Sequence, residues 1–521
     1  MENRKLRILL LTVLPAILFW LAWPPRDLFF LGLFAFVPLF LLEKETHHHK
    51  RSGWLIYASL LLWNIVISWW VWNAEPVSSI VMMVANSFLM YIPWYVYRKS
   101  RSTFGDSKAL FVFVAVWLSY EYLHLNWQIT WPWFTLGNIF AKHNEVVQWY
   151  EITGALGGSL WVLLSNVVVF SAIQSVGGFK KWIKPALVII LPILISGGFY
   201  FLSSPISYHK RQGYEAVIVQ PNIDPYEKFN GGEEIKNLQT MLDLAETQIT
   251  DSTKYIIMPE TAVVEYVDED YPTQFESIRL LKEFTKKHKN AHIVTGISTF
   301  NFYDQGEEME PTARESRGRY YESYNTALEV SPNGQLDLYH KSKLVPGAEK
   351  MPYPKVFSFL EYFALNLGGI SGSLGRDKSP KVFDAGSNPD LAPLICYESV
   401  FPGYVSEFTR RGAEILLVIT NDGWWKDTDG YKQHMYYARL RAIENRREVI
   451  RSANTGISCR INRMGQIMER SEWWEPSALR VEVQPYSNLT FYSQYGDYIG
   501  RFGSFIGVFF MLGLFVKRRV R

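Results

Sequence analysis

The sequence predicts a membrane α-helical bundle of about eight transmembrane helices, with a layered α/β domain inserted before the last helix. Two observations support this fold class. Apolar runs cut by short charged links fill the first two hundred residues and return at 502–516. Between them, charged residues are frequent, and strand-like runs alternate with amphipathic stretches. The predicted division is 1–212 for seven helices, 213–486 for the α/β domain, and 487–521 for the eighth helix and a cytoplasmic tail.

Composition agrees with a chain that is part membrane-embedded and part globular. At 521 residues it is long enough for at least two units with sizeable cores. Aromatic residues make up 16%, including 19 Trp, and they are typical of lipid–water interfaces. A net charge of +3 is too small to indicate nucleic-acid binding. The two cysteines, Cys396 and Cys459, do not support a disulfide framework.

Each predicted span is an apolar run bounded by polar links. A run of about 20 apolar residues can cross a bilayer as a helix. The predicted spans are 6–23, 28–42, 54–72, 77–95, 109–123, 160–176, 183–202 and 502–516. Because further spans follow the first, we expect 6–23 to be a retained helix and not a cleaved signal peptide.

Lys and Arg gather in alternate links between these spans. They are frequent in the first ten residues, at 44–51, at 98–108, at 180–184 and in the last five residues. The intervening links hold only Arg26 and Lys142. Since short basic links stay in the cytoplasm, we expect both chain ends to be cytoplasmic and the α/β domain to lie outside. In a bacterium with two membranes, the helices are then in the inner membrane and the domain is in the periplasm.

The α/β domain is predicted from apolar residues that recur with strand or helix periods. The predicted strands are 216–220, 255–258, 292–297, 326–330, 394–396, 415–420, 449–453 and 479–483. The predicted helices are 233–250, 273–289 and 431–447. Glu260, Cys396 and Asn421 come at the ends of strands. Functional groups gather at strand ends in such domains, so we expect these three residues to lie close together.

Glu260, Lys341 and Cys396 supply the groups needed for thiol-dependent acyl transfer. A free thiol has a pKa of about 8.5, so Cys396 needs a base, and Glu260 is the candidate if burial raises its pKa. Lys341 is a candidate for stabilising an oxyanion, together with a backbone N–H such as that of Tyr397. Each residue alone has a plainer explanation: a solvated carboxylate, a surface cation, or a buried structural thiol, which is our interpretation of Cys459.

In this order, the three residues resemble the catalytic Glu, Lys and Cys of the nitrilase superfamily. With its membrane spans, the chain is similar to the apolipoprotein N-acyltransferases. Five segments of this chain resemble motifs of that family: VIVQPNI, LVPGAE, ICYE, TNDGWW and TWPWFTLGN. The family commonly has LVPFGE where this chain has LVPGAE, and often has Trp where Phe229 stands. Lys341 keeps the expected spacing of eight residues before Glu349.

The resemblance implies a nitrilase-like αββα sandwich and an enzyme of lipoprotein maturation. Such an enzyme moves an acyl chain from a phospholipid to Cys396 as a thioester, and then to the N-terminal amine of a diacylglyceryl-modified cysteine on an apolipoprotein. The expected partners are the phospholipid, the apolipoprotein and the membrane; we expect a monomer with no cofactor and no metal. The supporting or substrate-binding residues that it implies are Glu349, Tyr397, Glu398, Asn325, Phe229, Asn421 and Trp424.

Apolar groups outside the spans are candidates for shielding a thioester from water. The stretch 351–370 is too interrupted to span a membrane, and with Trp424 and Trp425 it is our candidate for acyl-chain contacts. Core packing is the plainer explanation of the two Trp pairs, Trp424–Trp425 and Trp473–Trp474. The three adjacent His at 47–49 do not converge on one metal ion, so we expect a solvated link there.

Three other classes of protein stay open at this point. A membrane-tethered amidase could use the same three residues, but it would need only one anchoring span. A transporter would need charged residues along its spans, and these are sparse, with Glu121 near one span end. A binding module without catalysis is disfavoured because all three reactive residues are present.

Overall fold

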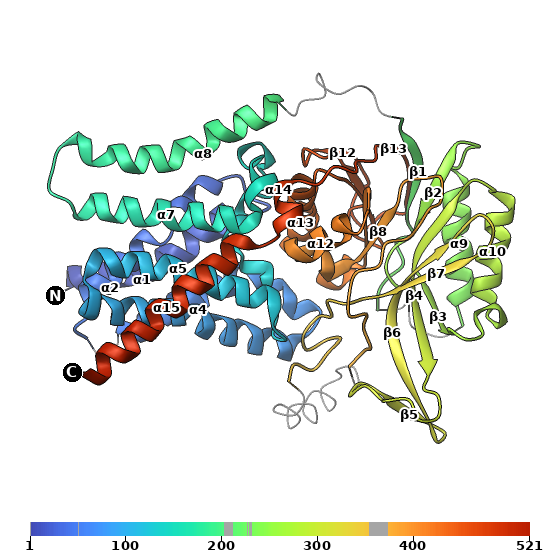
Figure 1. Cartoon of the computed structure of the whole chain (residues 1–521), viewed down its shortest axis with the longest axis horizontal. Helices are drawn as coiled ribbons and strands as arrows, with labels where there is room; N and C mark the ends of the chain where they lie inside the picture. Colours follow the sequence, from blue (N-terminus) through green and yellow to red (C-terminus); the bar gives the residue numbers. More distant parts are fainter. Residues whose placement is uncertain are drawn as a thin grey trace. The chain divides into compact units, whose positions relative to one another are not determined.

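The computed structural model describes residues 2–49, 52–202, 212–226, 228, 232–353 and 373–520. The chain divides into two compact units (Figure 1). One is helical and comprises Met1–Ser204 with Tyr495–Arg521. The other is the α/β unit, Pro205–Gln494.

Seven helices in the described part of the chain are long and apolar enough to cross a membrane. They are α1 (Glu2–Ala22), α3 (Ser52–Ser68), α4 (Pro76–Phe104), α5 (Asp106–Asn126), α7 (Ala155–Gln174), α8 (Ile183–Leu202) and α15 (Tyr498–Val520). Each contains or overlaps one predicted span. The helical bundle of the predicted fold class is therefore confirmed.

The predicted span 28–42 is not one continuous helix. It forms a 3-10 turn, η1 (Phe29–Leu33), followed by the ten-residue helix α2 (Val37–Thr46), which begins with a proline near its amino end. The buried side chain of Asn166 in α7 satisfies the backbone at this break. Its Oδ1 accepts from the Phe36 N–H at 2.7 Å, and its Nδ2 donates to the Gly32 carbonyl at 3.0 Å. Irregular backbone at membrane depth is tolerated where protein buries it in this way.

Basic helix ends meet at one end of the helical unit. Arg7 near the start of α1 pairs with Glu45 at the end of α2, and Glu43 pairs with Arg101 near the end of α4. Lys517 at the end of α15 donates to the Thr103 carbonyl at 3.2 Å. The broken segment therefore returns the chain to the end where α1 begins.

The chain leaves and re-enters the helical unit at its opposite end. Lys44 of α2 hydrogen-bonds Gln174, so α7 finishes at the basic end. The helix α8 starts after a short link and runs away from that end, as the hydrogen bond from Ser196 to the Glu145 carbonyl at 2.7 Å shows. Because α15 finishes at the basic end, it also begins at the opposite one.

The α/β unit contains two sheets with helices on their outer faces (Figure 1). The larger has the order β13-β1-β2-β4-β6-β5, with β3 beside β4 and β7 beside β6; the smaller has the order β12-β11-β10-β9-β8. The strands of the larger sheet are β1 (Tyr214–Gln220), β2 (Thr253–Ile257), β3 (Val263–Asp268), β4 (His292–Phe302), β5 (Arg314–Ser316), β6 (Arg319–Val330), β7 (Leu336–His340) and β13 (Ser477–Val483). Those of the smaller sheet are β8 (Leu391–Ile395), β9 (Ile415–Thr420), β10 (Glu448–Ala453), β11 (Cys459–Ile461) and β12 (Ile467–Arg470).

Helices cover both sheets of the α/β unit (Figure 1). Leu238 and Met241 of α9 (Glu234–Glu246) and Leu281 of α10 (Glu276–Lys287) are buried in one core with the larger sheet. The helices α12 (Pro402–Arg410) and α13 (Asp429–Asn445) accompany the smaller sheet. All eight predicted strands and three predicted helices are present. The sequence did not predict α12 or the short strands β3, β5, β7, β11 and β12.

A chain of polar side chains joins three spans inside the helical unit. Asn86 of α4 donates from Nδ2 to Asn64 Oδ1 of α3 at 2.7 Å. Its own Oδ1 accepts from the Tyr120 hydroxyl of α5 at 2.8 Å. All three side chains are buried, so each bond replaces a polar group that would otherwise be unsatisfied in an apolar surround.

We expect Asn86→Leu to destabilise the helical unit by about 1–2 kcal/mol, because Asn64 and Tyr120 each lose a partner. The measurement is the thermal unfolding midpoint of the purified protein in detergent. Asn126→Leu is the matched control, since Asn126 is exposed and its amide donates to the Tyr122 carbonyl of its own helix. An unchanged midpoint for Asn86→Leu, or an equal loss in the control, would contradict this expectation.

Candidate active site

The ends of four strands bring the predicted reactive residues together. Cys396 directly follows β8, Asn421 directly follows β9, and these two strands are parallel. Lys341 directly follows β7, and Glu260 lies three residues beyond β2. Parallel strands end at one edge of a sheet, and the two sheets of the unit deliver Glu260, Lys341 and Cys396 to one site.

The ammonium group of Lys341 lies between two carboxylates. Its Nζ is 2.9 Å from Glu260 Oε1 and 2.7 Å from Glu349 Oε1, and the side chain is 1% exposed. Burial on its own lowers the pKa of Lys341, but the two carboxylates raise it well above its usual value. Lys341 is therefore a permanent cation at this site.

Backbone and amide donors hold the two carboxylates in place. Asn325 Nδ2 donates to Glu260 Oε1 at 2.9 Å and to Glu349 Oε1 at 3.3 Å. The second oxygen of Glu260 accepts from the Asn421 N–H at 3.2 Å, and that of Glu349 accepts from the Val345 N–H at 2.8 Å. Asn325, Glu349 and Asn421 thus lie in one hydrogen-bond cluster with Glu260 and Lys341.

The charge state of Glu260 differs from the expectation. Burial on its own raises the pKa of Glu260, but the ammonium of Lys341 and hydrogen bonds from neighbouring side chains lower it below its usual value. Burial and the negative charge of Glu260 raise the pKa of the Cys396 thiol well above its usual value. Our expectation of a raised Glu260 pKa is wrong, because the distance to Lys341 decides the sign. At neutral pH the site holds a carboxylate beside a protonated thiol.

Cys396 occupies a strained turn that Glu398 holds together. Its φ of +50° is in the left-handed region, which costs a non-glycine residue about 1–2 kcal/mol. Glu398 Oε2 accepts from the Ile395 N–H at 2.8 Å. Its Oε1 accepts from the Tyr339 hydroxyl at 2.6 Å and from the Ser342 N–H at 2.7 Å. Glu398 thereby ties the Cys396 turn to the residues on both sides of Lys341.

Of the remaining predicted residues, the structure describes Tyr397 and Trp424. Tyr397 follows Cys396, and its side chain is buried. The Trp424 ring packs edge-on against Tyr226 at 5.2 Å between ring centroids, and its carbonyl accepts from the Tyr226 hydroxyl. Phe229 and residues 354–370 of the apolar stretch lie outside the described residues.

Lys228 is a site residue that the sequence analysis missed. It is 3% exposed, and its Nζ donates to the Glu260 carbonyl at 3.2 Å and to Thr261 Oγ1 at 3.3 Å. Burial lowers the pKa of Lys228 to about 7, although Glu260 opposes that effect. Thr261 has a φ of +44°, so Lys228 anchors the strained backbone that carries Glu260. Nothing in the sequence distinguishes Lys228 from a surface lysine.

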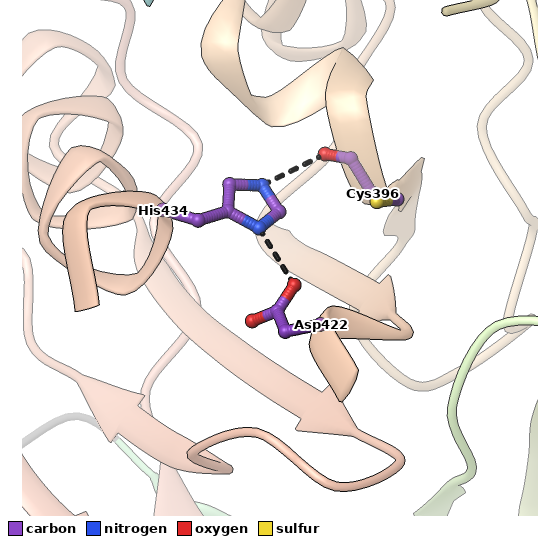
Figure 2. A group of neighbouring side chains, drawn as sticks. All are labelled: Cys396, Asp422 and His434. Atoms are coloured by element: carbon purple, nitrogen blue, oxygen red, sulfur yellow. Dashed lines mark hydrogen bonds and ion pairs between the residues drawn. The ribbon is translucent and has the colours of Figure 1, made fainter. Parts of the chain in front are cut away.

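His434, Asp422 and Arg451 form a second cluster that the sequence did not predict. Figure 2 shows His434 and Asp422 beside Cys396. His434 Nδ1 is 3.0 Å from Asp422 Oδ1, and Arg451 donates to the other oxygen of Asp422. Burial on its own raises the pKa of Asp422, but Arg451 and His434 lower it to about 2. The readable signal was Arg451, a charged residue in the middle of a fully buried strand.

These groups form a hydrogen-bond network and not a built metal site. Ligand atoms of Cys396, Asp422 and His434 lie within 4.8 Å of one another, a spacing that a metal ion could bridge. Both ring nitrogens of His434 and both carboxylate oxygens of Asp422 already have protein partners. The guanidinium of Arg451 also supplies the positive charge that a metal would bring.

Comparisons with known proteins identify the family of this chain. Residues 216–487 match the carbon-nitrogen hydrolase family model, and residues 15–168 match the apolipoprotein N-acyltransferase N-terminal domain. The chain is 30% identical to the apolipoprotein N-acyltransferase of Chlorobaculum tepidum, over 92% of this chain and 90% of that protein. It is 26% identical to the enzyme of the same name from Geobacter metallireducens, over 94% and 91%. The crystal structure of Saccharomyces cerevisiae Nit3, a nitrilase superfamily member, matches 53% of this chain and 91% of its own at 17% identity, with a TM-score of 0.38.

The α/β unit with its Glu–Lys–Cys cluster is a carbon–nitrogen hydrolase domain, as the sequence predicted. The helical unit is apolar and spans a membrane, so the whole is an integral membrane protein. The chain belongs to the apolipoprotein N-acyltransferase family.

The charge of Glu260 predicts how the Cys396 thiol titrates. In Glu260→Gln, the carboxylate that raises the thiol pKa is gone while Lys341 stays, so we expect the pH midpoint of Cys396 alkylation by iodoacetamide to fall by about one unit or more. Peptide mass mapping follows the reaction. Cys459 is an internal control, since it is fully buried and burial raises its pKa to about 12. A midpoint that stays or rises would contradict the assigned charge state.

Proposed function

We propose that the protein transfers an acyl chain from a phospholipid, through a thioester on Cys396, to the N-terminal amine of a diacylglyceryl-modified apolipoprotein. The observation that carries this proposal is the convergence of Glu260, Lys341 and Cys396 in a membrane-spanning member of this family. A tethered amidase would need one anchor, so seven spanning-length helices in the described chain support lipid substrates instead.

In the first half-reaction, the Cys396 sulfur attacks the ester carbonyl of the phospholipid. Glu260 takes the thiol proton while the carbon–sulfur bond forms. Because its pKa is low, this carboxylate accepts the proton in the transition state and not before it. The oxyanion faces the Lys341 ammonium and the Tyr397 N–H. When the intermediate collapses, the ester carbon–oxygen bond breaks and Glu260 returns the proton to the departing lysophospholipid.

In the second half-reaction, the α-amine of the acceptor attacks the thioester. Such an amine has a pKa of about 8, so a useful fraction is neutral and nucleophilic at pH 7. Glu260 accepts a proton from the attacking nitrogen and passes it to the Cys396 sulfur as the carbon–sulfur bond breaks. The amide forms, and the thiol and carboxylate return to their starting states.

Neighbouring residues serve these steps by holding the reacting groups. Glu349 keeps Lys341 charged and oriented, while Asn325 and Asn421 hold the Glu260 carboxylate. Glu398 supports the Cys396 turn. From the family resemblance, we assign Phe229 and Trp424 to substrate contacts. We assign residues 213–486 to the catalytic domain. We further propose that the protein is a monomer and works without a cofactor.

The test is intact-mass spectrometry after incubation with phospholipid in detergent. We expect a mass increase of one acyl chain that hydroxylamine removes, present in the wild type and absent from Cys396→Ala. Cys459→Ala is the matched control and should keep the adduct, because Cys459 is a fully buried strand residue. A folded wild-type protein without any adduct would overturn the phospholipid donor and favour the tethered amidase.

We propose further that the basic end of the helical unit faces the cytoplasm of a bacterial inner membrane. Arg7, Lys44, Arg101 and Lys517 gather there, and basic ends stay in the cytoplasm. The helix α8 finishes and α15 begins at the opposite end, so the segment between them lies outside, in the periplasm.

Membrane-impermeant maleimide tests this orientation in spheroplasts. Gln239→Cys, on the exposed face of α9, should be labelled in intact spheroplasts. His48→Cys, in the exposed link after α2, should be labelled only after lysis. The reverse pattern would overturn the proposed orientation.

A further inference from the structure

We infer that His434, together with Ser399, positions the peptide group between Cys396 and Tyr397 so that the Tyr397 N–H faces the oxyanion. His434 is thus a positioning residue that acts through the backbone. The inference rests on the proposed function, because it assigns a task within acyl transfer at Cys396.

The side chains of Ser399 and His434 hold the carbonyl oxygen of Cys396, and Figure 2 shows the His434 contact. Ser399 Oγ donates to this oxygen at 2.7 Å, and His434 Nε2 lies 3.2 Å from it. The same Nε2 lies 2.9 Å from Ser399 Oγ. Both Ser399 and His434 are buried, so water does not substitute for either of them.

Ser399 joins His434 to the Cys396 carbonyl. Its Oγ donates to the carbonyl oxygen, and His434 Nε2 lies within hydrogen-bond distance of both atoms. The Asp422 carboxylate lies at Nδ1, so the two ring nitrogens face different partners and the ring is fixed in orientation, whichever nitrogen carries the proton.

The opposite side of the peptide plane then follows from covalent geometry. The peptide after Cys396 is trans, and a planar trans peptide points its C=O and its N–H in opposite directions. Holding the Cys396 carbonyl therefore also aims the Tyr397 N–H. This aim needs support, because Cys396 has a φ of +50° and the peptide would otherwise relax toward a common conformation.

The rest of the network keeps the imidazole from turning. His434 Nδ1 is 3.0 Å from Asp422 Oδ1, which also accepts from Thr420 Oγ1 at 2.8 Å. Arg451 donates to the other oxygen of Asp422, and both of these side chains are fully buried. The ring is thus carried by α13, and its partner Asp422 is held by Thr420 at the end of β9 and by Arg451 in the middle of β10.

Because Cys396, His434 and Asp422 lie close together (Figure 2), they could also be interpreted as a cysteine–histidine–aspartate triad with His434 as the base. The contacts argue against it. His434 Nε2 faces the Cys396 carbonyl and Ser399, whereas the thiol hydrogen-bonds Glu260 and Thr420. A base would need its free lone pair at the sulfur.

Two reactions of the same thiol separate these roles. Acyl transfer from a p-nitrophenyl acyl ester forms an oxyanion, whereas alkylation by iodoacetamide displaces iodide from a saturated carbon and forms none. We expect His434→Leu to slow the p-nitrophenol burst by roughly 100-fold, the loss typical of one oxyanion donor. The alkylation rate at the same pH should stay within about threefold, because the thiol and Glu260 are untouched.

His434→Gln and Ser399→Ala complete the experiment. Glutamine can place an N–H near the position of Nε2, so we expect it to restore the burst to within about tenfold of the wild type. Ser399→Ala removes the other donor and leaves the Asp422–Arg451 pair intact, so it tests the same peptide if His434→Leu does not fold. Equal losses of burst and alkylation would overturn the inference and favour His434 as the base; an unchanged burst in both variants would overturn it outright.

Failure of the proposed function gives a different result. A wild type that is acylated by the p-nitrophenyl ester but not by phospholipid would refute the lipid donor and leave the His434 comparison valid. A folded wild type acylated by neither donor would refute both, because no oxyanion would then form at Cys396.

Discussion

The buried ammonium group of Lys341, held between two carboxylates, is the interaction on which the rest of the site depends. Removing Lys341, Glu260 and Glu349 from water is costly, and it is tolerated only where each charge has a partner and its other hydrogen-bonding positions are filled. Asn325 and two backbone N–H groups fill those positions. Burial and the Glu260 carboxylate raise the pKa of the Cys396 thiol more than Lys341 lowers it, which explains why the thiol keeps its proton at rest.

That cluster forms because two sheets meet where their strands end. Ser452 of β10 donates to the Val219 carbonyl of β1 at 2.8 Å, which joins the two sheets directly. The backbone after β2 also packs closely against β4. A Cβ added at Gly296 would lie 2.3 Å from the Thr261 nitrogen, so any side chain there would displace the turn that carries Glu260. Close sheet packing is therefore a condition of the charge cluster.

The sequence was sufficient for the parts of this arrangement that depend on local pattern. Strand endings located Glu260, Cys396 and Asn421, and apolar runs located seven of the helices. The broken segment at 28–42 could not be predicted, because the side chain that satisfies it, Asn166, lies 130 residues further along the chain. The sign of the Glu260 pKa shift likewise depends on its distance to Lys341, which no periodicity encodes.

A protonated resting thiol has a consequence for the proposed two-step cycle. The thioester on Cys396 has to survive until the acceptor amine arrives, and its leaving group is a thiolate that the surrounding negative charge disfavours. Its expulsion is therefore slow until Glu260 has taken a proton from the attacking nucleophile and can give it to sulfur. An amine forms the bond to the thioester carbonyl carbon more readily than water does. Burial and the Glu260 carboxylate both disfavour a free Cys396 thiolate, so they slow the reaction of the free thiol and the hydrolysis of the thioester alike.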